Sequence, residues 1–291
     1  MVVSEPYTNV SAIDGAAGGK APPAGAFTAV ILAGSRNIHD KVASLFGAHF
    51  KALVSIQGKP MVLHPLGALM ASRAVKRIVI IFDDEDQLYQ QCPELKVLAK
   101  QIDITVVPCR PTICGSVIQS LEATDCTWPY LLTTADHALL TAEMVDHFCN
   151  HALDQTDLAV GLVERAVIEK SHPTTKRTYL AFRDNQLSGA NLFAFMGEEA
   201  MNGIRLWKSI EQERKKPWKL FAAFGLVSFF GFLTKRFTVV EAFERASKRV
   251  GATARAVKLP FAEAAIDVDS PKDYAHVSSI LEARAAKAAS E

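Results

Sequence analysis

The chain has 291 residues, of which 49% are apolar and 22% charged, which is enough apolar material for a substantial core in an ordinary soluble protein. Its formal net charge of +1 argues against a general nucleic-acid-binding protein, which usually shows a clear basic excess. Five cysteines without a C-x-x-C pair favour a reduced, cytoplasmic setting over a disulfide framework. No apolar run reaches the roughly 18 residues that a membrane-spanning helix needs.

The first strand is preceded by a leader and followed by a small-residue turn. Residues 1–26 are rich in Ala, Gly, Pro and Ser and lack the features of a signal peptide, so we expect them to be disordered. The apolar run 29–32 predicts a buried parallel strand, which ends in the turn Ala33-Gly34-Ser35-Arg36. Backbone N–H groups of such a turn can bind an anion, and Arg36 and Lys51 would add positive charges. A nucleoside triphosphate is the natural occupant, although such a turn, taken alone, is more often an ordinary strand–turn–helix connection.

Short apolar strands alternate with helical segments in the rest of the first half. We expect helices over 61–72 and 86–100, the second interrupted at Cys92-Pro93, and a turn at Gly115-Ser116 that starts another helix. We expect strands over 77–82, 104–108 and 130–134. This alternation predicts an α/β fold with a mostly parallel sheet, whose ligand lies at the carboxyl ends of the strands. Arg36, Ser116 and Asp136 each follow a strand end and can therefore converge.

The second half has a different pattern. We expect a strand over 157–164, then a hairpin of 178–183 and 187–195, and helical segments over 201–233 and 239–250. Two late strands over 255–259 and 264–269 precede a helix that starts near Pro271. We therefore expect one domain over residues 27–280, with a helical insertion at about 200–250 and a flexible tail at 281–291.

Three acids end predicted strands. Asp136 ends one strand, and Asp267 and Asp269 end another, where alternation places the last two on the same face. Carboxylates that meet at about 4 Å repel each other by several kcal/mol, and a divalent cation removes that cost. These acids are therefore candidate Mg²⁺ ligands. The alternatives are that Asp269 caps the following helix and that Asp136 is a solvent-facing loop acid.

Three motifs, LAGSR…K…GKP, LLTTADHALLT and AAIDVDSPKDY, occur in this order over most of residues 27–277. Together they resemble the MobA-like nucleotidyltransferases, which include molybdenum-cofactor cytidylyl- and guanylyltransferases and sugar-phosphate nucleotidylyltransferases. The resemblance implies a three-layer α/β/α sandwich of the nucleotide-diphospho-sugar-transferase (GT-A) type. It also implies Mg²⁺-dependent transfer of a nucleoside monophosphate, with CTP favoured as donor, to a phosphorylated sugar, polyol or alcohol with release of pyrophosphate.

The same resemblance implies roles for individual residues. Arg36 and Lys51 would be the catalytic cations, Gly115 and Ser116 would contact the base, and Asp136 would be the first metal ligand. The second metal ligand would be Asp267, with Asp269 as the alternate. The triphosphate would be held by the turn that includes Leu32, Ala33, Gly34 and Ser35.

The acceptor pocket has two candidate segments. Lys176 and Arg177 form a compact cationic pair that could bind the acceptor's phosphate, or they could be a solvated basic turn. Gly189 and Asn191 resemble a glycine–asparagine turn that lies near the acceptor in the family, or they could simply form a hydrogen-bonding hairpin turn.

Other readings of the sequence remain open. Leu220–Leu233 is apolar and flanked by basic residues, which suits peripheral contact with the inner membrane surface, although a buried helical hairpin is favoured. The D-x-D pattern of Asp267-Val268-Asp269 suits a GT-A glycosyltransferase that uses a nucleotide sugar. The short glycine turn also admits a catalytically silent nucleotide-binding homologue. Nucleic acid is not an expected partner.

Overall fold

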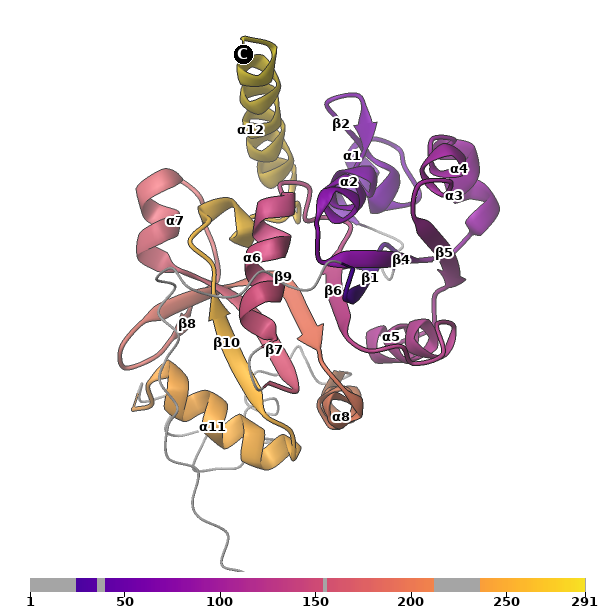
Figure 1. Cartoon of the computed structure of the whole chain (residues 1–291). Coiled ribbons are helices and arrows are strands. Elements are labelled where there is room, and N and C mark those ends of the chain that lie inside the picture. The colour runs from indigo at the N-terminus through magenta and orange to yellow at the C-terminus, as the bar shows by residue number, and fades with distance from the viewer. Residues whose placement is uncertain (1–24, 36–39, 154–155, 212–235, 291) are drawn as a thin grey trace, which may run out of the picture.

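The computed structural model describes residues 25–35, 40–153, 156–211 and 236–290 (Figure 1). Arg36, nearly all of the predicted leader and the apolar run Leu220–Leu233 lie outside the described residues. Within the described ranges, no helix combines the length and the apolar character needed to cross a bilayer.

The centre of the fold is a mixed, mostly parallel sheet with the strand order β10-β7-β9-β6-β1-β4-β5. Its parallel pairs are β1 with β4, β1 with β6, β4 with β5, and β7 with β10, whereas β9 runs antiparallel to both of its neighbours. The α/β prediction is therefore confirmed. These strands are β1 Phe27–Leu32, β4 Val75–Phe82, β5 Asp103–Pro108, β6 Tyr130–Thr134, β7 Leu158–Glu164, β9 Gln186–Phe195 and β10 Ala254–Lys258.

Two small hairpins complete the strands. β8 (Leu180–Ala181) pairs with the start of β9, as the predicted hairpin requires, and β2 (Ser55–Ile56) pairs with β3 (Lys59–Pro60) apart from the main sheet. The longer helices are α2 Leu63–Ala71, α5 Ile113–Glu122, α6 Ala142–Ala152, α8 Met201–Ile210, α11 Val239–Val250 and α12 Pro271–Ser290. The shorter helices are α1 Lys41–Leu45, α3 Glu85–Gln91, α4 Leu95–Leu98 and α7 Arg165–Ser171.

Helices cover both faces of the sheet (Figure 1). Alternation along β1 directs Ala29 and Ile31 into the core beneath α2 and α6, whereas Val30 lies in a second core with α5 and α8. All three side chains are fully or almost fully buried, as expected for a central strand. The molecule is therefore the three-layer sandwich that the resemblance implied.

Strand register brings the site-forming loops to one edge of the sheet. Leu32 at the end of β1 pairs with Thr134 at the end of β6, and the backbone N–H of Ala135 donates to the carbonyl of Leu32. The loop after β1 and the loop after β6 therefore leave the sheet side by side, at the carboxyl ends where ligands bind in this class of sheet.

Three local predictions need correction. Gly115 and Ser116 lie inside the first turn of α5 rather than before it, because Thr112 caps the helix and accepts the Gly115 N–H. Residues 262–265 form a short 3₁₀ turn, and the segment after it is extended but joins no sheet. Residues 281–290, expected as a flexible tail, continue α12 as a helix.

Candidate active site

A cavity of about 260 Å³ lies at the carboxyl edge of the sheet. It is bounded by the loops after β1, β5 and β6, by the 3₁₀ turn Lys51–Leu53 and by the segment before α12. The predicted residues Ser116, Asp136 and Asp269 lie in its wall, as do Lys51 and the turn after β1. The lining residues are Leu32, Ala33, Gly34, Ser35, Asp40, Lys51, Ala52, Ile81, Cys109, Arg110, Thr112, Ile113, Ser116, Thr134, Ala135, Asp136 and Asp269.

The turn after β1 packs tightly against the end of β5. A Cβ atom placed on Gly34 would lie 2.0 Å from the Sγ of Cys109, so only glycine fits there without movement. The next backbone N–H, that of Ser35, donates to Asp83 Oδ2 at 2.7 Å and fixes the direction in which the chain leaves the turn. Tight packing of this kind lets backbone form one wall of the cavity.

Lys51 supplies a fixed positive charge to the opposite wall. Its Nζ lies 2.5 Å from Asp136 Oδ2 and 3.0 Å from Asp269 Oδ1, and its side chain is only 18% exposed. Burial lowers the pKa of Lys51, but the charges of Asp136 and Asp269 and their hydrogen bonds outweigh it and raise the pKa overall. The ammonium group therefore remains charged at neutral pH.

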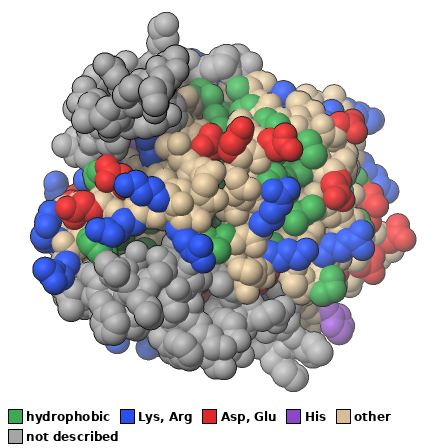
Figure 2. Space-filling view, turned by 90° about the horizontal axis from the view of Figure 1, so that it is seen from below, with side chains coloured by type: hydrophobic (Ala, Val, Ile, Leu, Met, Phe, Trp, Pro, Cys, Tyr) green, Lys and Arg blue, Asp and Glu red, His purple; other side chains and the backbone are tan. Residues whose placement is uncertain are grey.

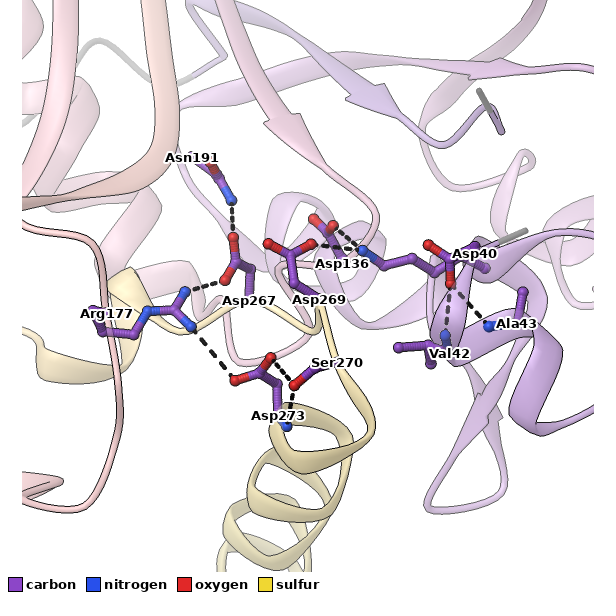
Figure 3. Close-up of polar contacts among 11 residues, drawn as sticks. Asp40, Val42, Ala43, Asp136, Arg177, Asn191, Asp267, Asp269, Ser270 and Asp273 are labelled. Carbon is purple, nitrogen blue, oxygen red and sulfur yellow. Dashed lines mark hydrogen bonds and ion pairs between the residues drawn. The ribbon is translucent and has the colours of Figure 1, made fainter. Parts of the chain in front are cut away.

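The extended segment before α12 presents its acids on one side. Ile266 and Val268 are fully buried, and the Val268 N–H donates to the carbonyl of Asp136 at 3.1 Å, which ties this segment to the loop after β6. Asp267 and Asp269 consequently point away from the core, as the alternation predicted. Their partners differ, however, since Asp269 contacts Lys51 whereas Asp267 accepts hydrogen bonds from Arg177 and Asn191 (Figure 3).

The acids around Lys51 suit a hard cation. Asp136 Oδ1 is buried and has no hydrogen-bond partner among the described residues, so an oxygen ligand remains available there. Within the described ranges no group of three or more His, Cys, Asp or Glu residues is arranged to hold a metal ion by itself. Mg²⁺ usually binds through one or two carboxylates together with substrate phosphates, so Asp136 and Asp269 fit that ion.

His137 directly follows Asp136 in the sequence, but its side chain is buried in the protein interior. Its ring is 1% exposed, and Nδ1 lies 3.3 Å from the hydroxyl of Thr133. Burial is the main cause that lowers the pKa of His137 to about 4, which outweighs the opposing effect of Asp136. The imidazole is therefore neutral at pH 7 and adds no positive charge to the cavity.

The first turn of α5 forms the remaining wall. Ser116 Oγ accepts the N–H of Arg110 at 2.8 Å and donates to the carbonyl of Thr112 at 3.1 Å, so it holds the loop before the helix. Gly115 does not line the cavity and instead borders a separate shallow hollow beside Arg110. Ser116 is thus positioned at the cavity as predicted, whereas Gly115 is placed outside its lining.

Sequence reasoning missed several residues of the cavity. Arg110 brings a second described cation to the lining, and Cys109, Thr112 and Asp40 also border it. Two of these residues could have been predicted from the sequence as helix caps. Asp40 and Thr112 stand directly before helical segments, and their side chains cap these helices. Arg110 had no such signal, since a single arginine after a strand is common in loops.

The predicted acceptor residues divide into two groups. Arg177, only 10% exposed at its side chain, forms an ion pair with Asp267 and lies 3.7 Å from Asp273, while Asn191 donates to Asp267 at 3.0 Å (Figure 3). Asn191 has a φ of 49°, a left-handed conformation that asparagine tolerates. Lys176 is exposed, and Gly189 borders open space. The structure therefore places Arg177 and Asn191 in contact with Asp267. In the part of the chain that the structure describes, neither forms a hydrogen bond or ion pair with the Lys51 centre, by which we mean Lys51 with Asp136 and Asp269.

Comparison with known proteins agrees with this architecture. A family model described as a MobA-like NTP transferase domain matches residues 29–190. Among curated proteins, none matches the chain. A solved structure titled as a hypothetical transferase from Thermus thermophilus is similar with a TM-score of 0.72 and 29% identity, over 86% of this chain and 99% of that one.

Two more distant structures share the fold. One is a CMP:2-keto-3-deoxy-manno-octonic acid synthetase complexed with CTP, with a TM-score of 0.56 and 14% identity over 89% of this chain and 99% of that one. The other is the inositol-1-phosphate CTP transferase of T. maritima, with a TM-score of 0.51 and 14% identity over 88% of this chain and 96% of that one. At such identity the likeness concerns the fold alone.

Proposed function

The chain belongs to the MobA-like NTP transferase family, and from this premise we propose that it moves a nucleoside monophosphate from an NTP to a phosphorylated small molecule. Pyrophosphate is the second product. We propose CTP as the donor and a sugar, polyol or alcohol phosphate as the acceptor. Two proteins that share the fold support this choice: a CMP:2-keto-3-deoxy-manno-octonic acid synthetase complexed with CTP, and an inositol-1-phosphate CTP transferase.

The observation that carries the proposal is the placement of Lys51. Its charged ammonium group and the tightly packed turn at Gly34 lie in the walls of one cavity, together with Asp136 and Asp269. A triphosphate and a divalent cation together need positive charge, close backbone approach and carboxylate ligands. One cavity offers all three.

In the proposed reaction, an oxygen of the acceptor's phosphate attacks the α-phosphorus of the NTP. The new P–O bond forms as the bond to the pyrophosphate leaving group breaks. Because the nucleophile is already anionic, no general base is required, and catalysis consists of alignment and charge stabilisation. Lys51 would stabilise charge on the phosphates, and Leu32–Ser35 would provide the backbone that approaches them. Arg36, outside the described residues, is proposed as the second catalytic cation.

Mg²⁺, when bound, would neutralise phosphate charge, and Asp136 and Asp269 are the residues that we propose to hold it. Their shared contact with Lys51 supports Asp269 as the second ligand in place of Asp267. Asp267 has a different set of partners in Arg177 and Asn191, which lie on the acceptor side in this proposal. Arg177 would then orient Asp267, while Lys176 and Gly189 remain candidate contacts for the acceptor.

The GT-A glycosyltransferase alternative would use Asp267-Val268-Asp269 as its D-x-D metal motif. In the structure only Asp269 lines the cavity, and the carboxylate of Asp267 is engaged by Arg177. A silent homologue would retain the cavity but would release no product. Release of pyrophosphate therefore distinguishes the proposed transferase from both alternatives.

The direct test is a pyrophosphate-release screen of CTP, UTP, ATP and GTP, with Mg²⁺, against phosphorylated sugars, polyols and alcohols. We expect release that requires one NTP and one acceptor together and that stops when EDTA removes divalent ions. Release from no combination, with consumption of a nucleotide sugar instead, would replace the proposal with the glycosyltransferase reading.

A further inference from the structure

Glu211 makes a buried contact that joins α8 to α5. Glu211 directly follows α8 and is only 7% exposed. Its hydrogen-bond partners lie almost 100 positions earlier in the sequence. Oε1 accepts the backbone N–H of Ile113 at 2.5 Å, and Oε2 accepts that of Cys114 at 3.3 Å. Both donors belong to the first turn of α5.

The chemistry of a helix N-terminus explains why a carboxylate is stable there. The first N–H groups of a helix have no partner within the helix, and the helix dipole favours negative charge at this end. In α5, Glu211 satisfies Ile113 and Cys114, and Thr112 Oγ1 accepts the N–H of Gly115 at 3.0 Å. Two charge-assisted hydrogen bonds also compensate the desolvation of the carboxylate.

The turn that Glu211 holds is a wall of the cavity. Thr112, Ile113 and Ser116 all line it, whereas Glu211 does not. The hydroxyl of Ser116 in turn holds the backbone of Arg110, another lining residue. Any movement of this first turn would therefore displace several groups that face the cavity, while the Lys51 centre, which is built on other elements, would keep its contacts.

We propose that Glu211 is a positioning residue that fixes the first turn of α5 in its nucleotide-binding conformation and thereby sets the affinity for the NTP. The inference rests on the proposed function, because it takes the cavity to be the nucleotide site. It also assigns the phosphates to the side of Lys51, because the ammonium group supplies positive charge there, whereas the three N–H groups that begin α5 already donate to Glu211 and Thr112. The base and ribose would then lie against α5.

Two substitutions test this role. Glu211→Ala removes both acceptors and the charge, whereas Glu211→Gln keeps one oxygen acceptor in a side chain of the same shape. Glu199→Gln is the matched control, because Glu199 is an exposed acid just before α8. Calorimetric titration with CTP, UTP, ATP and GTP would give the dissociation constant of each variant, and pyrophosphate release would give KM and kcat.

We expect Glu211→Ala to raise the dissociation constant and the KM for the NTP about tenfold or more, with Glu211→Gln intermediate. The acceptor KM and the kcat at saturating NTP should stay within about twofold of wild type, a split that general destabilisation would not produce. If Glu211→Ala does not fold, Glu211→Gln decides the question.

Unchanged NTP affinity in the folded Glu211 variants would overturn the inference and leave the proposed function intact. Equal losses in Glu211→Gln and Glu199→Gln would also overturn it. Absence of NTP binding by the wild-type protein would instead refute the proposed function, and this inference with it.

Discussion

At the scale of single residues, the site depends on one ammonium group held between two carboxylates. Two unit charges 4 Å apart interact by about 4 kcal/mol at the effective dielectric near a protein surface. Lys51 therefore offsets a substantial repulsion between Asp136 and Asp269, and it does so in a cavity wall where its charge can also act on a ligand.

Removal of either charge should greatly reduce turnover while the protein stays folded at the assay temperature. Lys51→Met keeps most of the side-chain volume but loses the charge, and Asp136→Asn loses a proposed metal ligand. We expect each to lower kcat/KM for pyrophosphate release by about 10²-fold or more, as for other losses of transition-state charge stabilisation. The melting temperature should fall in Lys51→Met, because Asp136 and Asp269 lose the cation between them. Circular dichroism would measure this fall and show that each variant is folded at the assay temperature.

Lys96→Met, at an exposed position on α4, is the control and should keep the wild-type rate. A wild-type rate in the Lys51 or Asp136 variant would remove that residue from the mechanism.

Some of these residues could be identified from the sequence, and others could not. Asp136 comes two residues after β6, and Lys51 follows the small-residue turn after β1, so their position at one edge of the sheet was predictable. Their proposed roles came from the family resemblance. Glu211 lacks such a signal, because its partners Ile113 and Cys114 become neighbours only when α8 packs against α5. We propose Asp269 as the second metal ligand in place of Asp267 because Arg177, from a different segment, pairs with Asp267. That contact likewise had no signal in the sequence.

At the scale of elements, the turn after β1 is shaped by its contact with the end of β5. Gly34→Ala should disrupt the turn, because the new Cβ would overlap the Sγ of Cys109 at 2.0 Å. We expect a large rise in the KM for the NTP. Cys109→Ala removes the sulfur, so the double variant should recover much of the affinity, while Cys109→Ala alone should have a small effect.

The double-mutant cycle provides the control for this clash. Gly34→Ala and Cys109→Ala should couple strongly, because additivity fails for residues in contact. Losses that simply add would show that Gly34 matters for a reason other than the contact with Cys109.

Several elements were predictable because their signals are local. Pro93 ends a helix, and the structure accordingly separates α3 from α4 at that point. The amphipathic pattern of 239–250 became α11, which begins with a capping box of Thr238 and Glu241. The segment 264–269 was predicted as a strand from its apolar residues, but it pairs with the loop after β6 through Val268 rather than with a sheet.

At the scale of the whole molecule, β9 connects the two halves of the sheet. It lies antiparallel between β6 and β7, although nearly all the other neighbours in the main sheet run parallel. Alternating strands and helices predict a parallel sheet, but they do not predict that β9 lies between β6 and β7. Strand order is decided by pairing between segments that are distant in the sequence. The architecture was therefore predictable, and the strand order was not.

Charges of both signs occur on the face of the molecule that lies below α8 and α11 in Figure 1. Figure 2 shows Lys and Arg side chains there, interspersed with Asp and Glu side chains. The exposed basic residues of α11 are Arg245, Lys248 and Arg249. The predicted membrane contact through Leu220–Leu233 stays a prediction, because that run lies outside the described residues.

One buried and three half-buried histidines should make the stability of the whole protein sensitive to mild acid. Burial is the main cause that lowers the pKa of His64, His137, His147 and His172 below the ordinary value of 6.5, in the case of His137 to about 4. Well above pH 6.5 these rings are neutral in both the folded and the unfolded chain, so they add no pH dependence there. As the pH falls below 6.5, the unfolded chain binds protons that the folded chain does not, and the free energy of unfolding must fall.

Urea unfolding at pH 7.5 and pH 5.5 would measure this loss before most carboxylates titrate. His137 alone should account for about 1 kcal/mol over that interval. His137→Asn should therefore reduce the difference between the two pH values, whereas His49→Asn, at an exposed position, should leave it unchanged. An identical pH dependence in wild type and His137→Asn would show that His137 binds a proton as readily in the folded as in the unfolded protein, contrary to its burial beside Thr133.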